Sequence, residues 1–168
     1  ANGVSASVLS VPETKRPIHV FTKCLQFLNY DEIAEVLAKN GFDGADLAVR
    51  TGGQVLPENV ETDLPKAVKA LRKAGVDSNM IVTKINDADD PFAARTLKTM
   101  ADLGIKYYRM GYLAYDDKKS IVENLDMHKT AFEKLETLNR KYNVHGGYQN
   151  HSGQRVGGPV WDLYHLLK

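Results

Sequence analysis

The sequence has very little cysteine: Cys24 is the only one among 168 residues. A single thiol cannot form an internal disulfide, and no Cys/His spacing in the chain resembles a structural zinc site. Cys24 falls within an apolar run that we predict to be a β-strand. A lone thiol in such a run is more typical of a small buried side chain than of a reactive group, so we expect Cys24 to be buried.

An excess of one charge and long hydrophobic runs are also missing. The chain has 22 Lys and Arg residues against 21 Asp and Glu residues, and it contains no basic block with interleaved aromatic residues. No apolar run approaches the roughly 20 residues that cross a bilayer. We therefore expect no nucleic acid and no membrane among the partners of this protein.

The composition that is present, 43% hydrophobic and 26% charged residues, is typical of a globular domain with one sizeable core. Residues 1–16 are small and polar, and we predict that they form a flexible N-terminal segment. Such residues commonly follow the cleavage site of a signal peptide, although an arbitrary start of the chain would look the same. We favour export, for example to the periplasm, over a cytoplasmic location.

From Pro17 onward, β-branched and aromatic runs alternate with segments of helical periodicity. Asn29 is a good N-cap for the first helix, and Gly41, Gly75 and Gly104 mark the ends of the first three helices. The predicted strands cover residues 18–28, 44–49, 79–85, 105–115 and 144–153, and the predicted helices begin near residues 30, 63, 92, 120 and 159.

This strict alternation with short turns predicts an α/β fold of parallel strands joined by right-handed crossovers. A (β/α)8 TIM barrel and a doubly wound sheet both alternate in this way, but no GxGxxG or P-loop follows the first strand. Five strands fall short of the roughly 250 residues of a closed barrel. We predict that residues 17–168 form about the first five strands of one, a partial barrel. If the chain ended here, its outer strands would be bare edges, so a homo-oligomer is one alternative.

Polar side chains at the C-terminal ends of the strands are the candidate site, because parallel α/β folds collect their functional groups there. Arg50 and Arg109 lie at two such ends, where a guanidinium suits a carboxylate, a phosphate or a pair of sugar hydroxyls. An ion pair with Asp46 or Asp116 explains these arginines equally well. Lys84 follows the third strand.

Other polar residues have simpler structural explanations. Asp87, Asp89 and Asp90 form a carboxylate cluster that suits a cation, but aspartates just before Pro91 more often cap a helix. His19 opens the first strand, which is the wrong end for a barrel site. We expect neither feature to belong to the functional site.

Three segments in this order resemble the sugar phosphate isomerase/epimerase family of xylose isomerase-like TIM barrels. They are GADLAVRTGGQVLPENVETDLPKAV, DADDPFAARTLKTMADLGIKYYRMGY and YQNHSG. The resemblance implies a barrel whose mouth binds a divalent metal ion (Mn, Mg, Zn or Co) through side chains of the last four strands. In such enzymes the ion holds two adjacent sugar oxygens while carboxylates move a proton through an enediolate.

The resemblance places one metal ligand within these residues, at the end of the fifth strand. Family members often read Glu-Asn-His-Gly there, and aligning Asn150 and His151 puts Gln149 where the glutamate belongs. A neutral amide still offers an oxygen to a hard cation, but it cannot act as a base. The candidate metal ligands are therefore Gln149 and His151.

Three explanations of Gln149 stay open. The protein binds metal more weakly through the amide and later ligands, or it has lost metal catalysis and kept a carbohydrate-binding pocket. In the third, the alignment is shifted and His151 or His145 serves as the ligand.

The sequence therefore favours an enzyme, a sugar or sugar-phosphate isomerase or epimerase with a small carbohydrate as its ligand. The alternative is a non-catalytic carbohydrate-binding barrel. The expected substrate-binding residues are Arg50, Lys84, Arg109, Tyr112 and Asn150, and the catalytic residues are not identified by the sequence.

Overall fold

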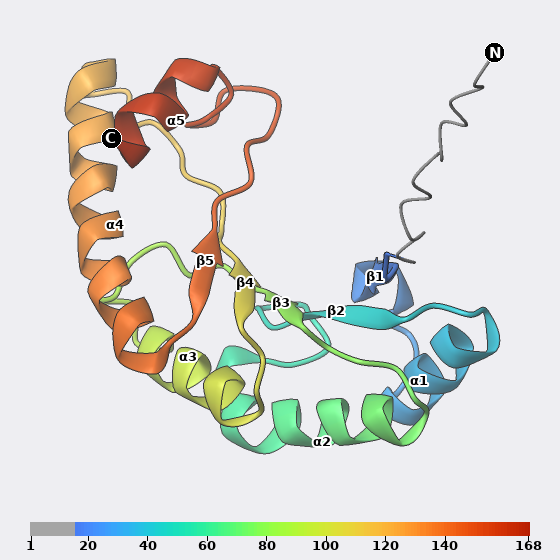
Figure 1. Cartoon of the computed structure of the whole chain (residues 1–168). Helices are drawn as coiled ribbons and strands as arrows, with labels where there is room; N and C mark the ends of the chain where they lie inside the picture. Colours follow the sequence, from blue (N-terminus) through green and yellow to red (C-terminus); the bar gives the residue numbers. More distant parts are fainter. Residues whose placement is uncertain (1–15) are drawn as a thin grey trace, which may run out of the picture.

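The computed structural model describes residues 16–168, which form a curved sheet of five parallel strands with helices on its outer side (Figure 1). The strands follow one another in chain order across the sheet, as β1 (His19–Phe21), β2 (Gly44–Ala48), β3 (Met80–Val82), β4 (Tyr107–Arg109) and β5 (His145–Gly147). The helices are α1 (Tyr30–Lys39), α2 (Val60–Lys73), α3 (Ala93–Asp102), α4 (Ile121–Tyr142) and α5 (Val160–Leu167), with short 3-10 helices η1 (Thr22–Leu25) and η2 (Pro57–Asn59). This is a partial (β/α) barrel, as the sequence predicted.

The register of the strands brings their C-terminal ends to one edge of the sheet. Phe21 pairs with Asp46, Val82 pairs with Arg109, and Arg109 in turn pairs with Gly147. Because side chains alternate between the two faces of a strand, Tyr108 and Arg109 point to opposite sides. Tyr108 donates a hydrogen bond to Asn139 of α4, so Arg109 faces the concave side, away from the helices.

The helices form where their cap residues predict. Asn29 and Glu32 make a reciprocal capping box at the start of α1, which confirms the predicted N-cap, and Ser120 and Glu123 make a second one at α4. Helix α2 begins at Val60, a few residues before the predicted start, because η2 leads directly into it.

The larger of two buried apolar clusters fills the space between the sheet and helices α1 to α4. Its fully buried side chains include Leu37 of α1, Leu64 of α2, Ile81 of β3, Leu97 of α3 and Leu135 of α4. A smaller cluster joins the loops after β4 and β5 to α4 and α5, through Leu113, Leu125, Val156 and Leu166. Within residues 16–168, no helix combines the length and the apolar character needed to cross a membrane.

The first strand is shorter than predicted, and this changes the position of Cys24. Strand β1 ends at Phe21, because the buried hydroxyl of Thr22 accepts a hydrogen bond from the Ala48 amide and donates one to the Gln54 side chain. The chain then turns into η1, where Cys24 is exposed. The prediction of a buried thiol in a long strand was therefore wrong.

Candidate functional site

The polar side chains predicted at the strand ends converge around Arg109. Its Nη1 donates hydrogen bonds to the Gln149 amide oxygen at 2.8 Å and to the Tyr112 hydroxyl at 2.9 Å. The Tyr112 hydroxyl lies a further 3.3 Å from the same Gln149 oxygen. Three of the predicted residues, from β4, the loop after it and the segment after β5, thus form one hydrogen-bonded group.

Aromatic rings separate three arginines in the same region. The guanidinium carbons of Arg50 and Arg109 lie 5.6 and 5.8 Å from the centre of the Phe21 ring. Those of Arg109 and Arg155 lie 4.9 and 4.8 Å from the centre of the Tyr112 ring. We call this alternating set, Arg50, Phe21, Arg109, Tyr112 and Arg155, the arginine–aromatic ladder. It runs from the end of β2 across to the loop after β5.

The arginines of the ladder are not neutralised by the described part of the chain. Within residues 16–168, no carboxylate forms an ion pair within 4.0 Å of Arg50, Arg109 or Arg155. Asp46 instead lies 3.3 Å from His19, and Asp116 pairs with Lys119. The ion pairs with Asp46 and Asp116 that offered a structural explanation for Arg50 and Arg109 do not form.

His151 packs against the ladder without joining the hydrogen-bonded group. Its ring meets the Tyr112 ring edge-on at 4.8 Å between centres. The His151 Nδ1 lies 2.9 Å from the Ser152 carbonyl oxygen. A carbonyl only accepts, so Nδ1 donates in this contact, and Nε2 has no hydrogen-bond partner among residues 16–168.

Lys84 and Asn150 lie beside the ladder. Lys84 and Arg50 line a cavity of about 230 Å³ next to the turn before α3, which also includes Asp90. Asn150 lines a wider hollow on the concave face, together with Gln149 and Arg109. Both residues are exposed and therefore accessible to a ligand.

The acidic turn before α3 has a structural role. Asp90 accepts a hydrogen bond from the Phe92 amide at 2.8 Å, Asp87 accepts one from the Asp89 amide at 3.0 Å, and Asp89 pairs with Lys134. Asp87 and Asp90 therefore stabilise the turn that leads into α3, but the expected helix cap does not form, because the N-cap of α3 is Phe92 and no side chain caps it.

His19 and Asp46 form a largely buried pair that joins β1 to β2. Their side chains are 17% and 16% exposed, and burial raises the pKa of Asp46 while the hydrogen bond and charge of His19 lower it. The pair lies on the strand face that carries Phe21, and Gly44 makes room for it, since a Cβ there would lie 2.4 Å from the His19 ring. His19 itself opens β1, at the N-terminal end of that strand.

Tyr148 connects the loops after β4 and β5, which carry Tyr112 and Arg155 of the ladder, by hydrogen bonds. The Tyr148 hydroxyl accepts a hydrogen bond from the Leu113 amide at 3.2 Å and donates one to the Val156 carbonyl at 2.6 Å. The Val156 amide also donates to the Leu113 carbonyl at 3.2 Å. Because Leu113 follows Tyr112 and Val156 follows Arg155, these contacts set the spacing of the last two members of the ladder.

The described residues do not fit a divalent metal ion at the end of β5. The Gln149 oxygen, which would be the ligand, already accepts a hydrogen bond from the cationic Arg109. A second cation beside that guanidinium would be repelled. Among residues 16–168, no group of three His, Cys, Asp or Glu side chains is placed to hold a metal. His151 Nε2 has no hydrogen-bond partner among the described residues, but a single imidazole nitrogen does not make a metal site.

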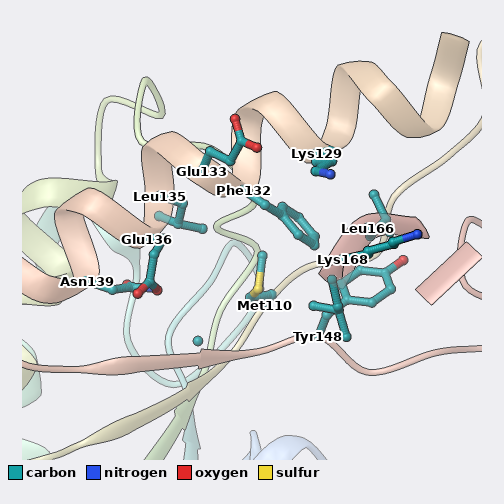
Figure 2. A pocket seen from close by; sticks show the side chains of 12 residues that line it. Met110, Lys129, Phe132, Glu133, Leu135, Glu136, Asn139, Tyr148, Leu166 and Lys168 are labelled. Atoms are coloured by element: carbon teal, nitrogen blue, oxygen red, sulfur yellow. The ribbon is translucent and has the colours of Figure 1, made fainter. Parts of the chain in front are cut away.

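A separate cavity of about 400 Å³ lies on the helix-covered face, between β5, α4 and α5 (Figure 2). Met110, Phe132 and Tyr148 lie around it, and Leu166 closes one side. Its lining is mostly apolar, and its position behind the sheet separates it from the ladder.

The sequence analysis missed two members of the ladder. Phe21 looked like an ordinary strand residue, and Arg155 lies in a loop to which no periodic pattern applies. One signal was present, since Phe21 is followed directly by the polar Thr22 and Lys23, which marks a strand end.

No protein-family model matches the chain, and no curated protein matches it significantly. Solved structures do. A 3-keto-D-glucoside 4-epimerase from E. coli is 12% identical with a TM-score of 0.68, over 91% of this chain and 64% of that one. D-psicose 3-epimerase from Clostridium cellulolyticum H10, solved with D-tagatose, is 13% identical with a TM-score of 0.61, over 90% and 60%. The IolI protein, solved with a zinc atom, is 15% identical with a TM-score of 0.60, over 79% and 51%.

At sequence identities of 12–15%, the similarity to these structures shows the fold alone. The chain has the architecture of the first five units of the (β/α) barrels in these structures. It spans between 51% and 64% of the length of these three proteins.

Proposed function

We propose that this chain forms the N-terminal part of the active-site barrel of a sugar isomerase or epimerase. The observation that carries the proposal is the convergence of Arg109, Tyr112 and Gln149 at the C-terminal ends of parallel strands. This is the edge where barrel enzymes bind their substrates. The fold shared with sugar epimerases supports the choice of a carbohydrate ligand.

The described residues would bind the sugar and stabilise negative charge on its oxygens. Arg50, Lys84 and Arg109 supply cationic donors, and Tyr112 and Asn150 supply hydrogen-bonding groups that suit sugar hydroxyls. Moving a proton between sugar carbons passes through an enediolate, in which an oxygen gains negative charge. A guanidinium held in advance at that oxygen lowers the barrier of this step.

The base that removes the carbon-bound proton is not among the members of the ladder. Gln149 cannot serve, because an amide does not accept a proton at neutral pH. His151 packs edge-on against Tyr112 of the ladder, and its Nε2 has no hydrogen-bond partner among the described residues, which suits it to exchange a proton with a bound sugar. A divalent metal bound elsewhere in the mouth would stabilise the same oxygens, and no step above depends on it.

Hydrogen exchange at sugar carbons tests this proposal. Full-length protein is incubated in D₂O with a panel of ketoses and aldoses, and deuterium is followed by NMR at the carbons next to the carbonyl. We expect incorporation, and we expect Arg109→Met to slow it by roughly 100-fold, the usual effect of losing one oxyanion donor. Arg95→Met is the matched control, because Arg95 also stacks on a ring, Phe92 at 5.2 Å, but on α3. If no sugar of the panel exchanged hydrogen or was converted to an isomer, the proposal that the protein is an isomerase or epimerase would be refuted.

A non-catalytic carbohydrate-binding barrel is the second candidate, and Gln149 favours it. The Gln149 amide accepts a hydrogen bond from Arg109 and stands where a metal-binding glutamate is expected, so the mouth has one carboxylate fewer. For a binding protein, calorimetry would detect sugar binding that EDTA does not change, without any exchange at carbon. For an enzyme, wild-type turnover would fall when Gln149 is replaced by Ala.

We also propose that the protein is exported, on the basis of the small polar residues at positions 1–16. Of these, residues 1–15 lie outside the part that the structure describes. Fractionation of the native host cells into periplasm and cytoplasm, followed by immunoblotting, tests this proposal. Recovery of the protein only in the cytoplasm would contradict it.

A further inference from the structure

The arginine–aromatic ladder concentrates positive charge at one point of an otherwise balanced molecule. The whole chain has a net charge of +1, yet three guanidinium groups follow one another across two aromatic rings. Within residues 16–168, none of the three has a carboxylate partner. Lys84 adds a fourth cation beside Arg50. Positive charge is therefore gathered at the strand ends, where Asp90 of the described chain lines the cavity shared by Arg50 and Lys84 but forms no ion pair with either of them.

The way the arginines are held leaves their N–H groups available. A guanidinium stacked on a ring keeps its donors in its own plane, where they remain free to bind an oxyanion. The Nε atoms of Arg50 and Arg109 are buried and have no hydrogen-bond partner. These Nε atoms are shielded from solvent, so a ligand would bind the terminal Nη groups. Only Nη1 of Arg109 has its bonds satisfied within the site.

A neutral sugar does not need this arrangement. Its hydroxyl groups both donate and accept, so sites for neutral sugars can use carboxylates and amides as well as cations. A carboxylate or a phosphate only accepts when ionised, and it matches the fork of a guanidinium with two parallel hydrogen bonds. The donor set of the ladder, three arginines with one nearby lysine, matches the second kind of ligand.

We infer that the ladder binds an anionic group of the substrate, a carboxylate or a phosphate monoester, so that the protein acts on an acidic sugar. This inference rests on the proposed function, because it names the substrate class of the same site. Phe21 and Tyr112 keep the three arginines apart, which reduces their mutual repulsion when the site is empty.

Calorimetry on the full-length protein with three matched sugars tests the inference. D-glucose, D-glucuronate and D-glucose 6-phosphate differ in the group at one end, so the two charged sugars separate a carboxylate from a phosphate. We expect at least one of them to bind tenfold or more tightly than glucose, with affinity that falls as salt is raised. Equal affinity for all three, or no binding of either charged sugar, would overturn the inference.

Substitutions then locate the anion. Arg109→Met and Arg155→Met should each weaken binding of the charged sugar by roughly 10-fold or more, the usual effect of removing a charge-assisted hydrogen bond. Arg95→Met, whose side chain stacks on Phe92 outside the ladder, should leave affinity unchanged. Arg155 is exposed, so its replacement should not unfold the protein even if that of Arg109 does. Unchanged affinity in Arg155→Met and in folded Arg109→Met would refute the inference.

The outcome is separable from that of the proposed function. Tight binding of a charged sugar without exchange at its carbons supports the inference that the ladder binds an anion. It contradicts the proposal that the protein is an isomerase or epimerase. Hydrogen exchange on neutral sugars, with an affinity equal to that of the charged sugars, supports the proposed isomerase or epimerase. It contradicts the inference that the ladder binds an anion.

Discussion

The guanidinium of Arg109 holds the side-chain oxygen of Gln149 at 2.8 Å, across the ends of β4 and β5. A cation thus lies against the atom that a metal ion would otherwise contact. We predict that Gln149→Glu alone gains little Mn²⁺ affinity, because the new carboxylate pairs with Arg109. The double substitution Arg109→Met, Gln149→Glu should bind Mn²⁺ more tightly than the single one by roughly tenfold, the effect of removing one nearby like charge.

Titration calorimetry of Mn²⁺ into the full-length wild type and both variants checks this prediction. Arg109→Met alone is the control, because it removes the cation without adding a carboxylate. Equal Mn²⁺ affinity in the single and double glutamate variants would show that Arg109 does not oppose a metal at this position.

Gly111 allows the close approach of the loops after β3 and β4. A Cβ at this position would lie 2.7 Å from the Lys84 carbonyl oxygen and 2.9 Å from the Asn86 side-chain nitrogen. We predict that Gly111→Ala lowers the free energy of unfolding by about 1–3 kcal/mol, as overpacking does, and weakens sugar binding because Tyr112 is displaced. Urea denaturation and calorimetry measure the two effects.

Gly147→Ala is the control for this substitution. At Gly147 the nearest atom to a Cβ, apart from its chain neighbours, is 3.9 Å away, which is an ordinary contact. A loss of stability in Gly147→Ala as large as that in Gly111→Ala would contradict the steric explanation.

Tyr108 makes stability depend on alkaline pH. Burial raises the pKa of Tyr108 from 10.0 to about 12, with a smaller opposite effect from its hydrogen bond to Asn139. Between these values the unfolded chain loses the phenolic proton while the folded chain retains it, so stability is fully present below pH 10 and falls as pH rises toward 12. We predict a smaller fall for Tyr108→Phe.

Urea denaturation of the two proteins between pH 8 and pH 11 measures this dependence. At pH 8 the substitution should cost about 1 kcal/mol through the lost hydrogen bond. Tyr164→Phe, which changes an exposed ring, provides the comparison. If wild type and Tyr108→Phe lose stability equally above pH 10, Tyr108 is not the source of the effect.

Cys24 should react with thiol reagents in the folded protein. It is exposed in η1 and is the only cysteine of the chain. A thiol open to solvent reacts without unfolding, so we predict that Ellman's reagent modifies one thiol per chain at a rate within about tenfold of that in urea. Cys24→Ser should abolish the reaction. A rate that rises a thousandfold on unfolding would instead indicate a buried thiol.

Periodic sequence features predicted the fold well. The capping residue Asn29 and the glycines after the helices located the elements, and alternation along the chain predicted parallel strands. Strand lengths were overestimated, since β4 covers Tyr107–Arg109 of a predicted run of eleven residues. An apolar run shows that a segment is buried, but the hydrogen bonds that end a strand, such as those of Thr22, come from distant residues.

The candidate site was predicted only in part, for the same reason. Arg109, Tyr112 and Gln149 were identified from their place at strand ends, and the structure brings them into contact. That Arg109 contacts Gln149 could not be predicted, because the two are forty residues apart and meet through the register of β4 and β5. Arg155 depends on the path of a loop, which no local pattern determines.

Tyr148 shows how the ligand preference of this barrel can change without any change at the mouth. Its ring packs among side chains of the helix-covered face, while its hydroxyl joins the loops that present Tyr112 and Arg155. A mutation on the helix-covered side of the sheet that shifts the Tyr148 ring would move Tyr112 and Arg155 together. Selection for a new substrate therefore has a second place to act, in the apolar layer between β5 and α4, where a change of even one methyl group alters the packing.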